Sequence, residues 1–150
     1  MKFVIQRTSK ASVMIEQKVY SSIVKGLVVL IGIEKGDTTD LLDYYVKKIV
    51  NMRIFNDHNQ KMNQSLLDIK GEILLVSQFT LLANTKKGNR PSYIRAAKPD
   101  VAIPLYEKFI TKLEKETSIK IQTGQFGADM KVELLNDGPV TIIIDSKNRE

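Results

Sequence analysis

The chain has 150 residues, of which 43% are apolar and 27% are charged, and its formal net charge is +6. These values are typical of a soluble globular protein, and the length fits one domain over residues 1–150. The absence of cysteine excludes disulfides, thiolate catalysis and cysteine-based metal sites. No apolar signal segment follows Lys2, and the longest apolar run, residues 27–33, is too short to cross a bilayer. We therefore expect a cytoplasmic protein with no membrane partner, and the positive charge favours a polyanionic partner.

Strand signals dominate the beginning of the chain. Short β-type runs with alternating or β-branched side chains occupy residues 3–7, 11–15 and 19–23. Residues 27–33 are apolar throughout, which predicts a strand buried on both faces. Gly36 and Asp37 then open a helix that ends near Met52, with Asp37 as its N-cap. Apolar residues at helical spacing define this helix, namely Leu42, Tyr45, Val46 and Ile49.

The second half of the chain repeats the order of strand, helix and strand. A short strand at residues 53–55 and a turn at 56–59 lead to a strongly apolar strand at residues 72–82. Pro99 suits the first turn of a second helix. Its predicted buried face consists of Ala102, Leu105, Tyr106, Phe109, Ile110 and Leu113.

The last strands are predicted at residues 119–122, 129–135 and 140–145. Residues 136–139, Asn-Asp-Gly-Pro, are typical of a tight turn between the last two strands. The element order indicates an α+β fold, with a mostly antiparallel or mixed, barrel-like sheet covered by two main helices.

Most catalytic signatures are missing from this sequence. His58 is the single histidine and lies in a polar turn, so a surface residue is a better interpretation than a catalytic or zinc-binding one. No glycine-rich loop of a nucleotide-binding type is present. We therefore expect no metal and no cofactor.

Two short motifs are candidates for chemistry. Ser77, Gln78 and Thr80 interrupt an apolar strand, and burying such side chains is unfavourable unless each finds a hydrogen-bond partner. The alternative is that the strand simply reaches the surface there. Gly138-Pro139 is readily explained as a turn in which proline opens the last strand, but it also has a functional interpretation that requires a cis bond.

A basic segment covers residues 84–98 and contains no acidic side chain. Its cations are Lys86, Lys87, Arg90, Arg95 and Lys98. Charge runs of this kind are usually solvated loops, and the alternative is a surface that contacts the phosphates of a nucleic acid.

Taken together, these segments resemble the D-aminoacyl-tRNA deacylase family. The matching stretches lie in the family's order at residues 4–7, 77–81, 88–93, 127–130 and 136–141. The stretches at 77–81 and 136–141 are specific when they occur together. Tyr93 is the one departure, at a position where the family would have phenylalanine.

The resemblance implies a homodimer with its active site at the subunit interface. Gly138 and a cis-bonded Pro139 of one subunit would face Ser77, Gln78, Phe79 and Thr80 of the other. Their carbonyl oxygens would hold the α-amino group of the substrate and leave no room for an L side chain, whereas glycine would be accepted. Arg7 would brace this motif, and Phe126 and Ala128 would complete the substrate pocket.

The implied reaction is hydrolysis of a D-aminoacyl-tRNA ester without a protein general base. Backbone N–H groups near Gln78 and Phe79 would stabilise the oxyanion, Thr80 would orient water or ester, and the 2′-hydroxyl of the tRNA would assist. Lys86, Lys87, Arg90 and Arg95 would contact the tRNA. Two alternatives remain open, a non-catalytic RNA-binding protein and a hydrolase of small esters.

Overall fold

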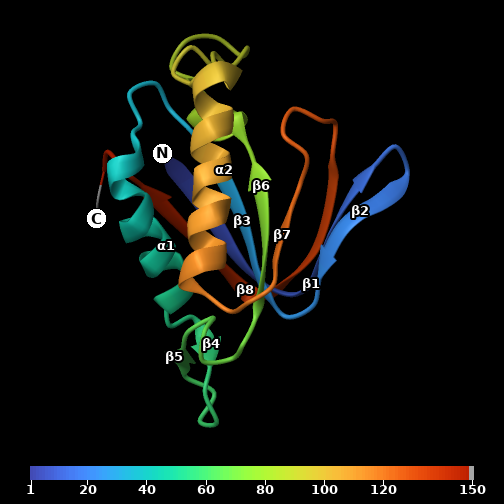
Figure 1. The fold of residues 1–150 in the computed structure, drawn as a ribbon. Coiled ribbons are helices and arrows are strands. Elements are labelled where there is room, and N and C mark those ends of the chain that lie inside the picture. Colours follow the sequence, from blue (N-terminus) through green and yellow to red (C-terminus); the bar gives the residue numbers. More distant parts are fainter. Residues whose placement is uncertain (149–150) are drawn as a thin grey trace.

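The computed structural model describes residues 1–148, which form a six-stranded mixed sheet with two helices packed on one face (Figure 1). The strands of this sheet are β1 (Lys2–Ile15), β2 (Lys18–Ile23), β3 (Gly26–Gly32), β6 (Glu72–Ser77), β7 (Ile121–Thr123) and β8 (Lys131–Asp145). The helices are α1 (Leu42–Asn51) and α2 (Pro99–Glu116), with short 3₁₀ helices η1 (Thr39–Leu41) and η2 (Phe79–Leu82). A separate pair of short strands consists of β4 (Phe55–Asn56) and β5 (Met62–Gln64).

The sheet has the strand order β2-β1-β3-β6-β7, and β8 also pairs with β1. Strand β1 is antiparallel to β2, β3 and β8, whereas the β3–β6 and β6–β7 pairs are parallel. The hydroxyl of Ser21 in β2 donates to the carbonyl of Thr123 in β7 over 2.7 Å, which joins the two ends of this order. The sheet is therefore nearly closed, and the predicted barrel-like mixed sheet with two helices is confirmed.

The core lies on both faces of the central strands. On one face, Leu27, Val29 and Ile31 of β3 pack with α1 and α2 in the larger apolar cluster. On the other face, Val28 of β3 packs in a second cluster with residues of β1 and β6. The prediction that residues 27–33 are buried on both faces is thus confirmed, and such burial explains why the run contains no polar residue.

Helix α2 follows the prediction and α1 departs from it. Pro99 begins α2, whose buried residues include Ala102, Phe109 and Leu113. Helix α1 begins only at Leu42, after η1, and Asp37 is not its N-cap. The Asp37 carboxylate instead accepts hydrogen bonds from the Met1 ammonium, at 2.7 Å, and the Glu34 N–H, at 2.6 Å. These contacts override the local preference for a cap.

Strand β6 ends at Ser77, earlier than the predicted end at residue 82, because the backbone turns into η2. The N–H of Gln78 still donates to the carbonyl of Ile31 over 2.8 Å, which closes the pairing of β3 with β6. The polar residues that interrupt the apolar run therefore mark the point where the strand stops.

The tight turn predicted at residues 136–139 is wrong. The chain does not reverse here, because the residues on both sides of this segment belong to the single strand β8 and pair antiparallel with β1. Asn136 lies opposite Thr8, and Thr141 lies opposite Gln6. Between these two pairs, β1 advances by two residues and β8 by five, so the extra residues of β8 form a bulge. Residues 2–15 are likewise one strand and not two.

No helix in residues 1–148 is both long enough and apolar enough to cross a membrane.

Candidate active site

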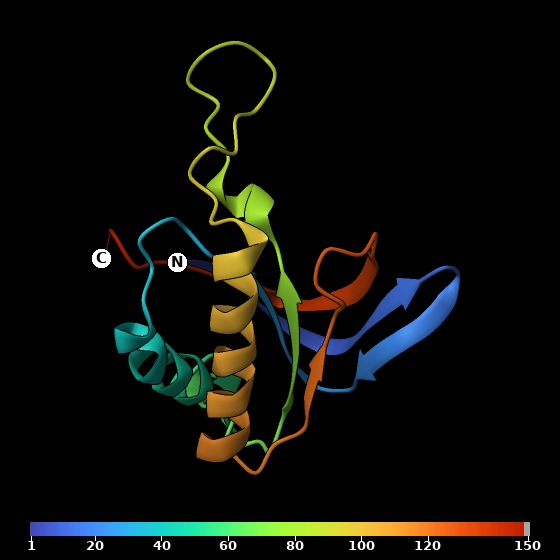
Figure 2. The ribbon, with the colours of Figure 1, turned by 45° about the horizontal axis from the view of Figure 1, so that its top comes forward.

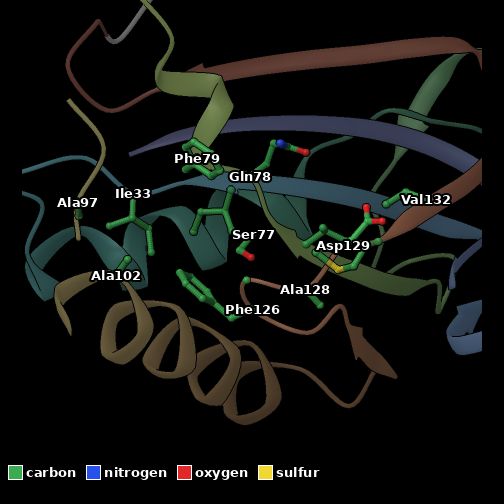
Figure 3. A pocket seen from close by; sticks show the side chains of 14 residues that line it. Ile33, Ser77, Gln78, Phe79, Ala97, Ala102, Phe126, Ala128, Asp129 and Val132 are labelled. Carbon is green, nitrogen blue, oxygen red and sulfur yellow. The ribbon is translucent and has the colours of Figure 1, made fainter. Parts of the chain in front are cut away.

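A cavity of about 300 Å³ opens where β6 ends (Figure 3). Its lining comes from β3, β6, η2, the start of α2, the segment between β7 and β8, and the beginning of β8. The lining residues are Ile31, Ile33, Val76, Ser77, Gln78, Phe79, Ala97, Ala102, Phe126, Gly127, Ala128, Asp129, Met130 and Val132. Most of these side chains are apolar and a few are polar, namely Ser77, Gln78 and Asp129, which is the usual composition of a small-molecule site. The structure therefore brings Ser77, Gln78 and Phe79 together with Phe126 and Ala128.

The turn from β6 into η2 supplies two of the polar lining residues, Ser77 and Gln78. The side-chain amide of Gln78 donates to the hydroxyl of Thr80 over 2.5 Å, which links the two predicted site residues directly. The Gln78 N–H is occupied by its bond to Ile31. The first bond of η2 runs from the Leu81 N–H to the Gln78 carbonyl, so the N–H groups of Phe79 and Thr80 have no partner within that helix.

The apolar wall opposite this turn depends on contacts made by α2. The hydroxyl of Tyr106 donates to the carbonyl of Leu75 over 2.9 Å, and its ring packs against Phe126 with centroids 5.9 Å apart. Burial raises the pKa of Tyr106, which keeps this hydroxyl protonated and able to donate. Ala102 lines the cavity from the first turn of α2. Because the methyl side chain of Ala102 has no reactive group, the sequence predicts it only as a core residue of the helix and not as part of a site.

Gly138 and Pro139 lie on the exposed bulge of β8, and neither belongs to the lining of the cavity within the described chain. The peptide bond between them is cis, as the resemblance implies. Gly138 has a φ of +123°, and a Cβ at this position would lie 2.9 Å from Nη2 of Arg7. Only glycine fits both this backbone and this close approach.

Arg7 anchors the bulge from inside the sheet. Its side chain is 7% exposed, and its Nε donates to the carbonyl of Asp137 over 3.0 Å. Nε also lies 3.3 Å from the Asp137 carboxylate, and Nη1 donates to Ile54 O at 2.7 Å and to Asn56 Oδ1 at 3.2 Å. The guanidinium thereby fixes the β8 bulge to the β4 region, because its planar fork supplies several donors at once.

The basic segment forms a loop that projects beyond η2 and the start of α2 (Figure 2). Backbone hydrogen bonds of 2.8 and 3.0 Å between Asn84 and Ser92 close its base. The side chains of Lys86, Lys87 and Arg90 lie in the exposed part of this loop. Arg95 differs from these cations, because its Nε lies 2.6 Å from the carboxylate of Glu34.

The buried carboxylate of Glu34 holds the loop against the cavity. Its other oxygen lies 3.0 Å from Nζ of Lys147. Neighbouring backbone bonds join Lys35 N to Arg95 O and Ala97 N to Ile33 O, each over 2.9 Å. Ile33 and Ala97 both line the cavity, so this ion pair helps to fix one of its walls. The hydrogen bond from Arg95, assisted by Lys147, holds the pKa of Glu34 below its ordinary value of 4.5 despite burial.

A Glu34→Gln variant is expected to lose about 1–2 kcal/mol of unfolding free energy at pH 7, since its partners are half exposed. Because the folded-state pKa is depressed, the stabilisation is fully present above the ordinary pKa of 4.5 and is lost as pH falls through the folded-state value. Urea unfolding at pH 7 and at about pH 3.5 measures both effects. The difference in unfolding free energy between wild type and variant should be smaller at the lower pH. Exposed Glu114→Gln is the control, and an equal loss in both variants would contradict the assignment.

His58 is exposed in the turn between β4 and β5 and lies outside the lining of the cavity. Among the residues that the structure describes, no group of three or more His, Asp or Glu side chains is placed to hold a metal ion. The chemical groups that line the cavity are the hydroxyl of Ser77, the amide of Gln78, the carboxylate of Asp129 and backbone groups.

Comparison with known proteins places the chain in a family. The family model described as D-Tyr-tRNA(Tyr) deacylase matches residues 4–145. Proteins named D-aminoacyl-tRNA deacylase from Flavobacterium psychrophilum and Flavobacterium johnsoniae are 61% and 63% identical, over 100% of both chains in each case. A solved structure named c-Myc DNA Unwinding Element Binding Protein has a TM-score of 0.92 and 42% identity, and covers 97% of this chain and 99% of its own.

A second solved structure, of a probable eukaryotic D-amino acid tRNA deacylase, has a TM-score of 0.79 at 18% identity, over 95% of this chain and 97% of its own. At that identity the similarity shows a shared fold. The family model and the full-length relatives carry the assignment further. The chain belongs to the D-Tyr-tRNA(Tyr) deacylase family and is an enzyme.

Proposed function

We propose that the chain hydrolyses the ester between a D-amino acid and the terminal ribose of a tRNA, releasing free amino acid and tRNA. The observation that carries this proposal is the cavity at the end of β6, which combines an apolar hollow of about 300 Å³ with Ser77, Gln78 and the start of η2. A hollow of this size suits an amino acid better than a macromolecule. The names of its full-length relatives support the same substrate. Such an enzyme would act in the cytoplasm.

The chemical step needs little from the protein beyond positioning and charge stabilisation. Water attacks the ester carbonyl, and the resulting oxyanion would receive hydrogen bonds from the N–H groups of Phe79 and Thr80, since that of Gln78 is occupied. The hydroxyl of Thr80, oriented by Gln78, would hold the water or the ester. The bond to the ribose oxygen then breaks, and the neighbouring 2′-hydroxyl would relay a proton: it gives its own proton to the departing oxygen and takes up the proton that the attacking water loses.

The chiral selection would come from a second subunit. Gly138 and Pro139 stand exposed on a rigidly anchored bulge and do not line their own cavity, which suits insertion into the cavity of a partner in a homodimer. Their carbonyl oxygens would bind the α-ammonium group and occupy the space that an L side chain requires. Glycine has no side chain to exclude, so glycyl-tRNA would also be a substrate.

The basic loop would hold the rest of the tRNA. Lys86, Lys87 and Arg90 are exposed and suited to phosphate contacts, which weaken as salt rises. Arg95 would contribute less to this surface than the sequence indicates, because its guanidinium is bound to Glu34.

Deacylation of matched D-tyrosyl-, L-tyrosyl- and glycyl-tRNA by the purified protein, with a chelator present, tests the proposal. We expect rapid hydrolysis of the D-ester and of the glycyl ester, and almost none of the L-ester. Equal hydrolysis of the D- and L-esters would contradict chiral exclusion. Hydrolysis of small esters that lack tRNA at a similar rate would instead indicate a hydrolase of small esters.

A second candidate function, beside catalysis, is the binding of other nucleic acids. Two observations favour it, namely the exposed basic loop and the similarity to a structure whose name specifies a DNA element. It predicts salt-sensitive binding of DNA or RNA that carries no aminoacyl ester.

A further inference from the structure

The side chain of Asn136 closes the two ends of the β8 bulge. Its Nδ2 donates to the carbonyl of Val140 and to the carbonyl of Arg7, each over 3.0 Å. Val140 lies four residues further along β8, so the first bond spans the bulge, whereas the second joins the bulge to β1. One carboxamide group thereby ties together the point where the chain enters the bulge, the point where it leaves, and the neighbouring strand.

The groups around this carboxamide fix its orientation. Its nitrogen has two N–H donors, and each of them meets a carbonyl oxygen. If the carboxamide turned over, Oδ1 would face the same two carbonyl oxygens and both would lose their donor. On the other side, Oδ1 accepts from the hydroxyl of Thr141 over 3.5 Å, and Nε2 of Gln6 donates to that hydroxyl over 3.3 Å. The position therefore uses both donors and the acceptor that asparagine provides.

Asn136 and Arg7 hold different parts of the bulge. The guanidinium of Arg7 binds the carbonyl of Asp137 and connects it to the β4 region, whereas Asn136 binds the backbone of Arg7 and the far end of the bulge. Gly138 and Pro139 lie between these anchors. Their positions therefore depend on the separation that Asn136 sets between the two ends of the bulge.

We propose that Asn136 is a positioning residue for chiral selection, because its carboxamide sets where the carbonyl oxygens of Gly138 and Pro139 stand. This inference rests on the proposed function and extends it from the motif that contacts the substrate to the side chain that holds the motif. Discrimination by exclusion requires a fixed obstacle, since a bulge that can widen leaves room for an L side chain. Loss of the clamp should therefore affect the choice between D- and L-esters and not only the overall rate.

Hydrogen exchange measured by NMR tests the clamp without any chemical step. In Asn136→Leu, which keeps a similar size but has no donor, the backbone N–H groups of residues 137, 138, 140 and 141 should exchange about tenfold faster than in wild type, because two hydrogen bonds are lost. The N–H groups of β3 should keep their wild-type rates. Asn51→Leu is the matched control, since the Asn51 carboxamide also donates to a backbone carbonyl, that of Lys47, over 2.9 Å, but lies in α1.

Initial rates with D-tyrosyl- and L-tyrosyl-tRNA test the positioning role. The ratio of kcat/KM for the D-ester to that for the L-ester should fall by about tenfold in Asn136→Leu and stay at the wild-type value in Asn51→Leu. A general loss of folded protein lowers both rates equally and leaves this ratio unchanged. Asn136→Ser, whose shorter hydroxyl serves at most one of the two carbonyls, should show a smaller fall and keeps the test decisive if Asn136→Leu does not fold.

Two results would overturn the inference and keep the proposed function. Faster exchange with an unchanged ratio of D- to L-ester hydrolysis would show that Asn136 only stabilises the bulge, and unchanged exchange would show that it does not clamp the bulge. A wild-type protein that hydrolyses neither ester would instead contradict the proposed function and, with it, the role of Asn136 in selection. The exchange rates would in that case still decide whether Asn136 holds the bulge.

Discussion

Replacing Gly138 by alanine is expected to lower kcat/KM for D-tyrosyl-tRNA by about 100-fold, because a small displacement of a substrate-positioning group has effects of that order. The new Cβ would lie 2.8 Å from Cγ2 of Val140 and 2.9 Å from Nη2 of Arg7. The φ of +123° adds strain for any L residue. The bulge must therefore shift, and the carbonyl oxygens proposed to hold the α-ammonium group shift with it. Comparison of initial rates for wild type and variant measures this effect.

Gly36→Ala is the matched control for this variant. Gly36 also has a positive φ, of +84°, but nothing lies within 4 Å of a Cβ built there. The control should lose some stability through strain and keep its kcat/KM. If both variants lost activity equally, backbone strain and not the position of the bulge would explain the result.

Replacing Arg7 by methionine is expected to lower the unfolding free energy by about 3 kcal/mol, because buried groups lose their hydrogen-bond donors. The Ile54 carbonyl loses a buried bond of 2.7 Å, and the Asp137 carbonyl loses one of 3.0 Å. For a domain of this size the midpoint of thermal unfolding should fall by about 6–12 °C. Deacylation should also fall, because the bulge is no longer fixed. Thermal denaturation and initial rates measure the two effects.

Arg7→Lys should give an intermediate loss, since an ammonium group keeps the charge but cannot reproduce the fork. Arg53→Met is the control, because the Nε of exposed Arg53 also donates to a backbone carbonyl, that of Asn63, over 2.8 Å. A loss in Arg53→Met as large as that in Arg7→Met would show that burial and contact with the bulge do not matter.

The parts of the fold that the sequence predicts well are those fixed by local chemistry. The apolar run at residues 27–33 is a strand buried on both faces because no polar group in it requires water. Helix α2 begins at Pro99 because proline fits the first turn, and its apolar spacing identifies the face that meets the sheet. In both cases the physical cause lies within a few residues.

The failures occur where distant residues decide the structure. The segment from Asn136 to Pro139 has the composition of a tight turn, yet β1 pairs with β8 on both sides of it and Arg7 holds the extra residues. Asp37 has the side chain of an N-cap, yet Met1 and Glu34 occupy its carboxylate. Arg7 and Met1 lie far from these segments in sequence, so no local pattern reveals their contacts, whereas Glu34 lies only three residues before Asp37.

The candidate site shows the same division. Ser77, Gln78 and Thr80 are visible in the sequence because these polar residues interrupt an apolar strand. The structure places Ser77 and Gln78 at the cavity, whereas Thr80 does not belong to its lining. Ala97 and Ala102 are missed because small apolar side chains carry no signal of their own. Their small side chains leave room for the cavity, and this becomes visible only when α2 is packed against the sheet.

A mixed dimer of two variants tests whether one subunit completes the site of the other. Ala128→Phe fills the cavity and Gly138→Ala displaces the bulge, so each variant alone should be inactive on D-tyrosyl-tRNA. The two variants are co-expressed with different affinity tags, and the mixed dimer is purified through both. Such a dimer has one site with both defects and one intact site, so we expect about half of the wild-type activity per dimer. A mixed dimer that stays inactive, or chains that do not purify together, would contradict the cross-subunit site.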